Sequence, residues 1–505
     1  MESASLASPG VEQELPGRAF SKGLKTNAIG YASNVVIAVA STAPAYSLAA
    51  TLGFVMLVSG VGLQGPAIIL ISFLPMLFIA AAYKYMNKAD PDCGTTFSWV
   101  TRAFGPQAGW IGGWGILTSD ILVMASLAQI AALYTFHLWY ASPSPSSIGV
   151  ILIGVGWIVI MTWICYIGIE LSARLQQILL TVEVITLAVF AVVALIDVYS
   201  HQAGAHAIKP TFAWFNPFDI SSFSTLGTAV LTGIFIYWGW DSGVAVNEES
   251  QDAATGPGRA AVVSTVLLLL IYLVVTTASQ AYAGPTALGN NANDIFAFLG
   301  PKVFPKPINL ILIITVLTST SASTQTTILP TARTSLAMAR WGAIPKIFGR
   351  VHPEHQTPDV STIAFGVIST AWFIAIDIIS PNNVLGDSVD AVGFMVCLYY
   401  GITGFACTWY YRHELTKSAR NFFFVGVAPL LGGLSLLGVF IIGMSYYGHQ
   451  INNYSKNVLG LGLPDVIGIG MIIIGLVLGL IMRQTLPGFY RGRKMEVADP
   501  ALLAD

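Results

Sequence analysis

Twelve mostly apolar runs of about 20 residues or more determine what this chain can fold into. A helix of about 20 apolar residues crosses the hydrocarbon core of a bilayer, and it satisfies its own backbone polar groups, as lipid requires. We therefore expect an all-α integral membrane protein with twelve transmembrane helices. The runs cover residues 27–60, 64–86, 108–138, 147–168, 173–198, 223–248, 259–284, 307–338, 359–380, 388–411, 422–447 and 463–483.

Composition excludes several classes of function. Only 10% of the 505 residues are charged, against about 25% in soluble domains. The net charge is −2 and no basic cluster suits a phosphate backbone, so we expect the lipid bilayer and a small molecule as partners, and no nucleic acid.

The chain has no P-loop or nucleophile elbow, and His352-Pro353-Glu354-His355 does not match the H-E-x-x-H zinc motif. We expect no enzymatic activity, no cofactor and no metal site.

The distribution of basic residues sets the expected orientation. An even number of spans places both ends of the chain on one side, and cytoplasmic loops are enriched in Lys and Arg. With the N-terminus inside, all but four of the 23 basic residues are cytoplasmic; the four are Lys209, Lys302, Lys306 and Lys456. We expect a multi-pass protein of the cytoplasmic membrane, with cytoplasmic tails at 1–26 and 484–505.

Two spans are interrupted at corresponding positions. Span 1 breaks at residues 41–46, STAPAY, because Pro44 lacks an N–H and disfavours helical backbone at Ala43. Span 6 breaks at Gly239–Gly243, around Asp241. The breaks lie five spans apart, and since five is odd, the second unit of five spans is inverted in the membrane. Paired broken spans indicate an inverted-repeat transporter with its site near the midplane.

Four segments resemble the amino acid–polyamine–organocation (APC) transporter family. The segment Ala332–Pro345 is close to the family pattern S-R-x-x-x-A-M-A-R-D-G-x-x-P. The segment that begins at Gly239–Asp241 is similar to the family's G-F-E…E-E…P pattern in span 6. The segments are Asp90–Trp99 with Arg102–Pro106, Gly239–Asp241 with Asn247–Glu249 and Pro257–Arg259, Ser172–Leu187, and Ala332–Pro345. Their order and topology make the resemblance specific over residues 27–411.

The resemblance implies the LeuT-type five-plus-five inverted repeat, with broken helices 1 and 6, and transport of amino acids or related amines. Residues 27–411 would form the ten-helix core, and spans 11 and 12, within 412–483, would pack on its flank. Two departures stand out. The span 1 break lacks the glycines that are usual in members that bind an α-carboxylate, and Glu183 stands where many members carry a lysine.

Substrate-binding residues are expected at the two breaks. Backbone groups there would hold the polar ends of the solute, and neighbouring aromatic rings can gate it or stack on an amine; those rings can equally fill the core. The candidates are Ser41, Thr42, Ala43, Pro44, Ala45 and Tyr46 in span 1, and Phe235, Tyr237, Trp238, Gly239, Trp240 and Asp241 in span 6.

Three acids at membrane depth are candidates for coupling or gating. Asp241 either acts as a gate or proton sensor, or caps the second half-helix of span 6. Glu183 either binds and releases the coupling proton, because a buried carboxylate without a nearby cation can be protonated near neutral pH, or is a neutral acid hydrogen-bonded to a neighbouring helix. Asp120 binds a substrate amine, neutralises a cation, or anchors span 3 to a polar neighbour.

Thr318–Thr327 in span 8 are the most polar ten residues of any span. Their hydroxyls could coordinate sodium together with span 1 carbonyls, or satisfy themselves within the helix and allow close packing. Thr320 and Thr324 are expected to line the site, and Tyr399 and Tyr400 of span 10 its vestibule.

These patterns predict a secondary transporter that moves an amino acid or related amine by alternating access. Coupling to protons, through Glu183 or Asp241, is the preferred interpretation. A transporter or exchanger of polyamines or other cationic amines stays open, as does a sodium-coupled symporter. A non-transporting membrane receptor is the alternative from a different class.

Overall fold

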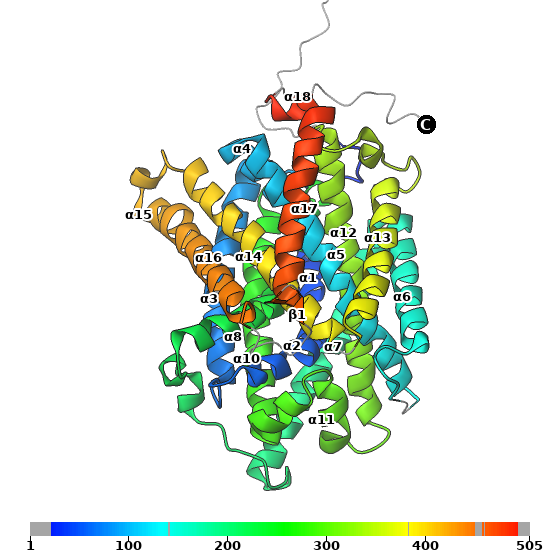
Figure 1. Ribbon diagram of the computed structural model, residues 1–505, viewed down its shortest axis with the longest axis vertical. Coiled ribbons are helices and arrows are strands. Elements are labelled where there is room, and N and C mark those ends of the chain that lie inside the picture. The colour runs from blue at the N-terminus through cyan, green and yellow to red at the C-terminus, as the bar shows by residue number, and fades with distance from the viewer. Residues whose placement is uncertain (1–21, 140–141, 382, 450–456, 459, 493–505) are drawn as a thin grey trace, which may run out of the picture.

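The computed structural model describes residues 22–492, except 140–141, 382, 450–456 and 459. Most of the two expected tails, and Lys456, lie outside the described residues. The regular secondary structure of the described residues is helical apart from one short hairpin, β1 (Asn457–Val458) and β2 (Leu461–Gly462), and one isolated bridge between Ile29 and Ser250. Figure 1 shows the long helices running roughly parallel to one another, with α4 and α18 at one end of the bundle and α11 at the other.

The long α-helices follow the apolar runs, and shorter helices lie between or after them. They are α1 (Tyr31–Thr42), α2 (Pro44–Leu57), α3 (Gly65–Ala89), α4 (Thr96–Phe104), α5 (Pro106–His137), α6 (Ile148–Ile167), α7 (Ile169–Tyr199), α8 (Phe223–Tyr237), α9 (Ser242–Ala245), α10 (Gly256–Asn290), α11 (Ile295–Val303), α12 (Asn309–Arg340), α13 (Asp359–Ile379), α14 (Val384–Tyr410), α15 (Ala419–Asn421), α16 (Ala428–Tyr447), α17 (Leu463–Thr485) and α18 (Pro487–Tyr490). Short 3₁₀ turns and one π-helical segment are η1 (Phe212–Phe215), η2 (Pro217–Asp219), η3 (Asn247–Glu249), η4 (Lys346–Gly349), η5 (Leu415–Lys417) and η6 (Phe422–Val427).

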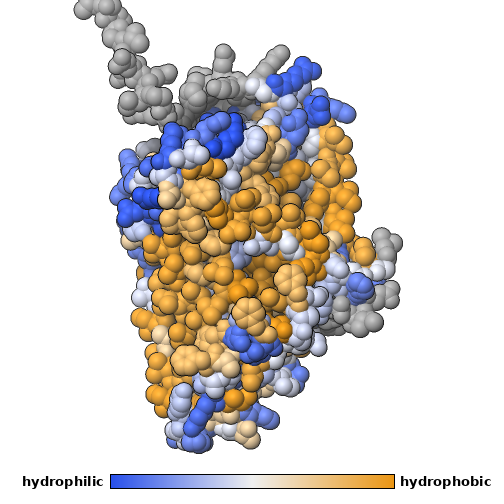
Figure 2. Space-filling model, turned by 90° about the vertical axis from the view of Figure 1, so that its left-hand side faces the viewer, coloured by the Kyte–Doolittle hydropathy of each residue, from blue (hydrophilic) through white to orange (hydrophobic). Residues whose placement is uncertain are grey.

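Ten of the described helices are long and apolar enough to cross a membrane. The other two expected spans differ for physical reasons: span 6 is interrupted between α8 and α9, and span 8, α12, carries the Ser/Thr run. The total of twelve therefore stays a prediction. Figure 2 shows a broad band of hydrophobic side chains between two more hydrophilic ends, as a bilayer-embedded protein requires.

Most expected boundaries agree with the helices within a few residues. The seventh span is longer than expected, because α10 continues past a kink at Gly284 to Asn290. The expectation that the span 6 break reaches Gly243 is wrong, since α9 already begins at Ser242. Gly243 is instead a packing residue: a Cβ there would lie 2.7 Å from the Asn34 carbonyl oxygen of α1.

Both predicted breaks are confirmed. Each half of span 1 packs against the opposite half of span 6. The first half of span 1, α1, packs against the second half of span 6, α9, while α2 packs against α8. Corresponding spans of the two expected repeats also pack on each other, α3 on α10 and α5 on α12. This crosswise pairing is the arrangement that two inverted units produce around a shared centre. The last two spans lie at the side of this core, α16 against α3 and α14, and α17 against α14 and α5.

Candidate functional site

The two helix breaks touch directly. Ala43 has left-handed backbone (φ 48°) between α1 and α2, with Pro44 at the first position of α2, where a missing N–H costs little. In span 6, Gly239 has φ +114°, and a Cβ at this position would lie 3.0 Å from the carbonyl carbon and oxygen of Ser41. Glycine is therefore required both by the backbone conformation and by the close approach to span 1.

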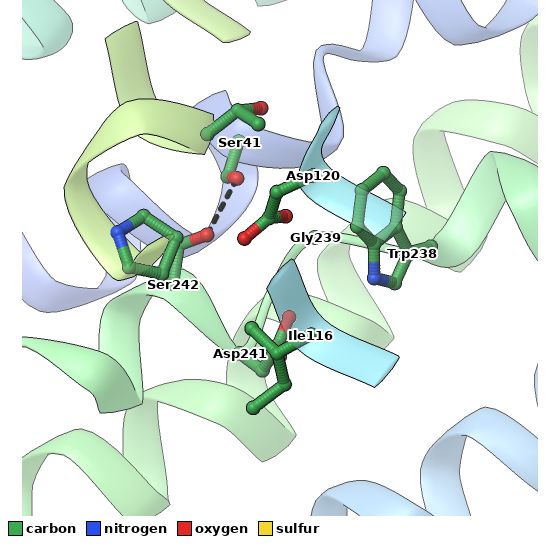
Figure 3. Close-up of a pocket in the computed structure, with 9 residues that line it drawn as sticks. Ser41, Ile116, Asp120, Trp238, Gly239, Asp241 and Ser242 are labelled. Carbon is green, nitrogen blue, oxygen red and sulfur yellow. Dashed lines mark hydrogen bonds between the residues drawn. The ribbon is translucent and has the colours of Figure 1, made fainter. Parts of the chain in front are cut away.

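A small cavity lies where the breaks meet. Its volume is about 10 Å³, roughly room for one water molecule, so the side chains leave little free space at the centre. Figure 3 shows the Asp120 side chain between the Ser41–Ser242 pair and the Trp238 ring. The hydroxyls of Ser41 and Ser242 lie 2.7 Å apart. The cavity is lined by Ser41, Ile116, Asp120, Trp238, Gly239, Asp241, Ser242, Thr327 and Pro330.

Two tyrosines of α14 hold Asp241. The Tyr400 hydroxyl donates to Asp241 Oδ1 at 2.8 Å, and the Tyr399 hydroxyl donates to Oδ2 at 3.0 Å. Asp241 occupies the N-cap position of α9, but its side chain makes no capping hydrogen bond. Trp238 Nε1 donates to the Tyr399 hydroxyl. Span 10 therefore reaches the span 6 break through a chain of aromatic side chains and one carboxylate.

Asp120 joins span 3 to span 8 while still facing the cavity. The Thr331 hydroxyl of α12 donates to Asp120 Oδ2 at 2.5 Å, which is the polar neighbour that the anchoring interpretation requires. No other hydrogen bond to Asp120 occurs among the described residues. Oδ1 is thus left for a group that enters the cavity, and anchoring and binding are compatible at this residue.

Glu183 is a residue of α7 and does not line the cavity. Its side chain lies against the beginning of α2. Its Oε1 accepts hydrogen bonds from the Ala45 N–H and from the Ser319 hydroxyl, both at 2.7 Å. Its Oε2 is buried without a partner among the described residues. One carboxyl oxygen therefore connects α7, α2 and α12, and the other is available to carry a proton.

The hydroxyls of span 8 divide into two groups. Those of Thr320 and Thr324 donate to carbonyls of their own helix, Val316 O at 2.6 Å and Thr320 O at 2.9 Å, and neither residue lines the cavity. Ser319 and Ser323 instead reach other spans: Ser323 donates to the Ser41 carbonyl at 2.8 Å, and Ser319 donates to Glu183.

The predicted aromatic residues have different surroundings. Trp238 lines the cavity, and Phe235 packs edge-on against Tyr46. Tyr237 faces away, since its hydroxyl donates to the Ile69 carbonyl of α3 at 3.2 Å and its ring packs on Tyr272. Trp240 stacks on Tyr400, with ring centroids 5.1 Å apart. Core filling thus describes Tyr237 and Trp240, whereas Trp238 borders the centre.

The remaining span 1 candidates support the break without lining the cavity. The Thr42 hydroxyl donates to the Val39 carbonyl at 2.7 Å, and the Tyr46 hydroxyl pairs with Ser126 of α5 at 2.7 Å. The Tyr46 N–H donates to the Ser319 hydroxyl at 3.2 Å. Sequence reasoning did not identify Ser242 and Thr331, and it named Ser319 and Ser323 only as members of the polar run Thr318–Thr327. The rotation of each helix decides which of these hydroxyls reach the breaks.

Three potential metal ligands lie together at the end of the bundle where α3 and span 6 end. They are Asp92, Cys93 and Glu248. The Lys22 ammonium lies among them, 2.9 Å from Asp92 Oδ2 and hydrogen-bonded to Glu248. Burial by itself would lower the pKa of Lys22, but attraction to Asp92, Cys93 and Glu248 outweighs it and raises the pKa well above its ordinary value. A lysine thus supplies the positive charge at this cluster.

The comparisons with known proteins agree with this arrangement of broken helices. The family model described as "Amino acid permease" matches residues 29–472. The human "Large neutral amino acids transporter small subunit 2" is 24% identical over 64% of this chain and 58% of its own length. The "Arginine/ornithine antiporter" of Latilactobacillus sakei is 23% identical over 80% of this chain and 86% of its own.

A third relative is the "Low-affinity putrescine importer PlaP" of Escherichia coli, 21% identical over 72% of this chain and 78% of its own length. The chain spans less than two thirds of the length of the mammalian relatives that it matches.

Proposed function

The chain belongs to the amino acid permease family, and we propose that it is a secondary transporter of an amino acid or a related amine. It acts by alternating access in the cytoplasmic membrane, with both termini cytoplasmic and the solute held between the breaks of spans 1 and 6. The relatives support this class of solute, because their names cover neutral amino acids, arginine and ornithine, and putrescine.

We propose that protons drive the transport and that Glu183 carries the coupling proton. The observation that supports this role is the pair of hydrogen bonds that Glu183 Oε1 accepts from Ala45 and Ser319, with Oε2 buried and unpartnered. Hydrogen bonds to an ionised carboxylate are stronger than those to a neutral acid. Protonation therefore loosens the contact between α7 and the beginning of α2, and loss of the proton tightens it.

Through the hydrogen bonds of Glu183 to Ala45 and Ser319, binding of the proton changes the positions of the helices. Since α2 packs against α8, a movement of α2 changes the space between the two breaks. Asp241 is the other candidate for the coupling proton, but its two tyrosine donors lie on α14. We assign it to holding the span 6 break and contacting the solute.

The test is uptake into proteoliposomes by the purified protein, with and without an inward proton gradient, in sodium and in choline buffer. Wild-type uptake is expected to rise with the gradient and to be indifferent to sodium. Glu183→Gln keeps the shape and the hydrogen-bonding oxygen but cannot ionise, so it should retain exchange of bound solute and lose stimulation by the gradient.

Asp377→Asn, at an acid of α13 that does not line the cavity, is the matched control. It should behave as wild type. Stimulation that persists in Glu183→Gln would remove the coupling role from Glu183, and uptake that requires sodium would replace proton coupling altogether.

A further inference from the structure

The amides at the beginning of α2 are all engaged by the protein itself. The free N–H groups at a helix N-terminus form a site for anions, and half-helix N-termini commonly hold the anionic group of a transported solute. Here Pro44 has no N–H, the Ala45 N–H donates to Glu183, and the Tyr46 N–H donates to Ser319. The Ser47 N–H donates to the Ala43 carbonyl at 2.8 Å.

Glu183 therefore occupies the place that the carboxylate of an amino acid would need. Its Oε1 lies 2.7 Å from the Ala45 nitrogen, and the residue is only 1% exposed. A second carboxylate brought to this helix terminus would lie against the first, in a region of low dielectric where like charges repel strongly. Glu183 therefore fills this anion site itself, as a carboxylate when it is ionised and as a hydrogen-bond acceptor when it is protonated.

The cavity itself favours positive charge. Asp120 and Asp241 both line it, from α5 and from the span 6 break, and none of the described residues that line it is basic. Asp120 has one hydrogen-bond donor, Thr331, which contacts Oδ2. A buried acid without a compensating group is costly, and a cationic solute between the two carboxylates would supply that group. The Trp238 ring borders the same space, and an aromatic ring can contact an amine by cation–π interaction.

From these observations we infer that the solute is a cationic amine without a carboxylate, such as a diamine or a guanidinium amine. Its amine lies between Asp120 and Asp241, and the internal carboxylate of Glu183 replaces the α-carboxylate of an amino acid at the beginning of α2. This inference rests on the proposed transport function and narrows its substrate class.

The experiment compares amino acids with their decarboxylated counterparts, which differ only in the group in question. The pairs are arginine and agmatine, ornithine and putrescine, and lysine and cadaverine. Each compound competes against labelled agmatine for binding to the purified protein in detergent, and each is tested for uptake into proteoliposomes. We expect the amine of each pair to bind at least about tenfold more tightly than its amino acid.

Two variants assign the preference to residues. Asp120→Asn should weaken binding of the amines at least about tenfold, and it should weaken binding of the amino acids as well, because both members of each pair carry the same cationic group. Glu183→Ala frees the Ala45 N–H and should shift the ratio toward the amino acid of each pair. Asp377→Asn again serves as control and should leave every ratio unchanged. Because the readout is a ratio measured within one protein preparation, a partial loss of folded protein does not alter it. Should Asp120→Asn fail to fold, Thr331→Val tests the same carboxylate from its partner.

The possible outcomes separate the two proposals. Amino acids that bind as well as or better than their amines would overturn the inference and leave the transport function intact. A protein that neither binds nor moves any of the six compounds or a neutral amino acid would overturn both. Ratios that Glu183→Ala leaves unchanged would show that Glu183 does not occupy the place of a carboxylate.

Discussion

The Oε1 atom of Glu183 lies 2.7 Å from the backbone nitrogen of Ala45, so a side chain of α7 supplies the acceptor at the beginning of α2. The same oxygen accepts from Ser319 of α12. One buried carboxyl oxygen therefore connects three spans that are distant in the sequence. Under the proposed function, a change of charge at this atom acts on the span 1 break through the protein itself.

Ser319→Ala should impair proton-driven uptake far more than Thr320→Val. The Ser319 hydroxyl donates to Glu183 and accepts from the Tyr46 N–H, and leaving a buried polar group unpaired costs about 1–3 kcal/mol. We expect at least about a tenfold loss in initial rate. The Thr320 hydroxyl donates only within its own helix, so Thr320→Val should stay within about twofold. Equal effects of the two substitutions would contradict the division of span 8 hydroxyls.

Gly239→Ala should abolish transport, because the added Cβ would lie 3.0 Å from the carbonyl group of Ser41 and the residue has φ +114°. The backbone conformation alone costs an L-residue about 1–2 kcal/mol. Gly438→Ala, on α16 with no atom near the added Cβ, is the matched control. Thermal unfolding of the two purified variants is the measurement, together with uptake, and a Gly239→Ala protein that transports normally would show that the breaks need not touch.

Tyr400→Phe should lower transport by about tenfold or more, because it removes one hydrogen bond to Asp241. The substitution keeps the ring, so the loss can be assigned to the hydroxyl. A hydrogen bond to a charged group contributes about 1.5–3 kcal/mol. Tyr399→Phe should have the larger effect, since its hydroxyl also accepts from Trp238 Nε1. Equilibrium binding and initial rates, measured side by side, show whether the loss arises in binding the solute or in the later steps.

Glu249→Gln should strongly destabilise the protein. Arg333 contacts Glu249 through two hydrogen bonds, Nε to Oε2 at 2.6 Å and Nη2 to Oε1 at 2.8 Å, and both side chains are at most 1% exposed. Removing one partner of such a pair leaves an uncompensated buried charge and costs about 3–5 kcal/mol. The double variant Glu249→Gln, Arg333→Met should recover part of the loss in melting temperature. No recovery would mean that the pair's shape, and not its charge, is required.

Asp90, outside the spans, predicts a pH dependence of stability. Burial first, and then repulsion from Asp92, raise the pKa of Asp90 from 3.8 to about 6, although Arg102 acts in the opposite direction. The folded state then binds the Asp90 proton more tightly than the unfolded state does. The stability that protonated Asp90 contributes is therefore lost as the pH rises from about 4 to about 6. The melting temperature should therefore be higher at pH 5 than at pH 7, by about 2 °C or more. Asp90→Asn should remove this difference.

The neighbouring Lys22–Asp92 pair should not contribute in that range. The pKa of Lys22 is raised, and the pKa of Asp92 is lowered because Lys22 outweighs the effect of its burial. Both groups therefore stay charged between their ordinary pKa values of 3.8 and 10.5. A transport profile that changes near neutral pH in Asp90→Asn as in wild type would show that neither Asp90 nor this pair is its origin.

The sequence by itself determined the membrane architecture and the two breaks. Long apolar runs have one stable solution in lipid, and Pro44 and Gly239 act on their own backbone, so their effects do not depend on distant parts of the chain. The three acids at membrane depth were visible for the same reason, because a charge is conspicuous in an apolar run.

Only the tertiary structure decided which side chains meet. A helix that is apolar all round has no stripe to show which side faces the core, and the consecutive polar residues of Thr318–Thr327 surround α12 on all sides. The sequence therefore does not indicate how α7 and α12 are rotated. For that reason Thr320 and Thr324 were expected at the site, whereas Ser319 and Ser323 make the contacts between spans. The same rotation places Glu183 on the amide of Ala45, 138 residues away in the chain, a distance that no local pattern encodes.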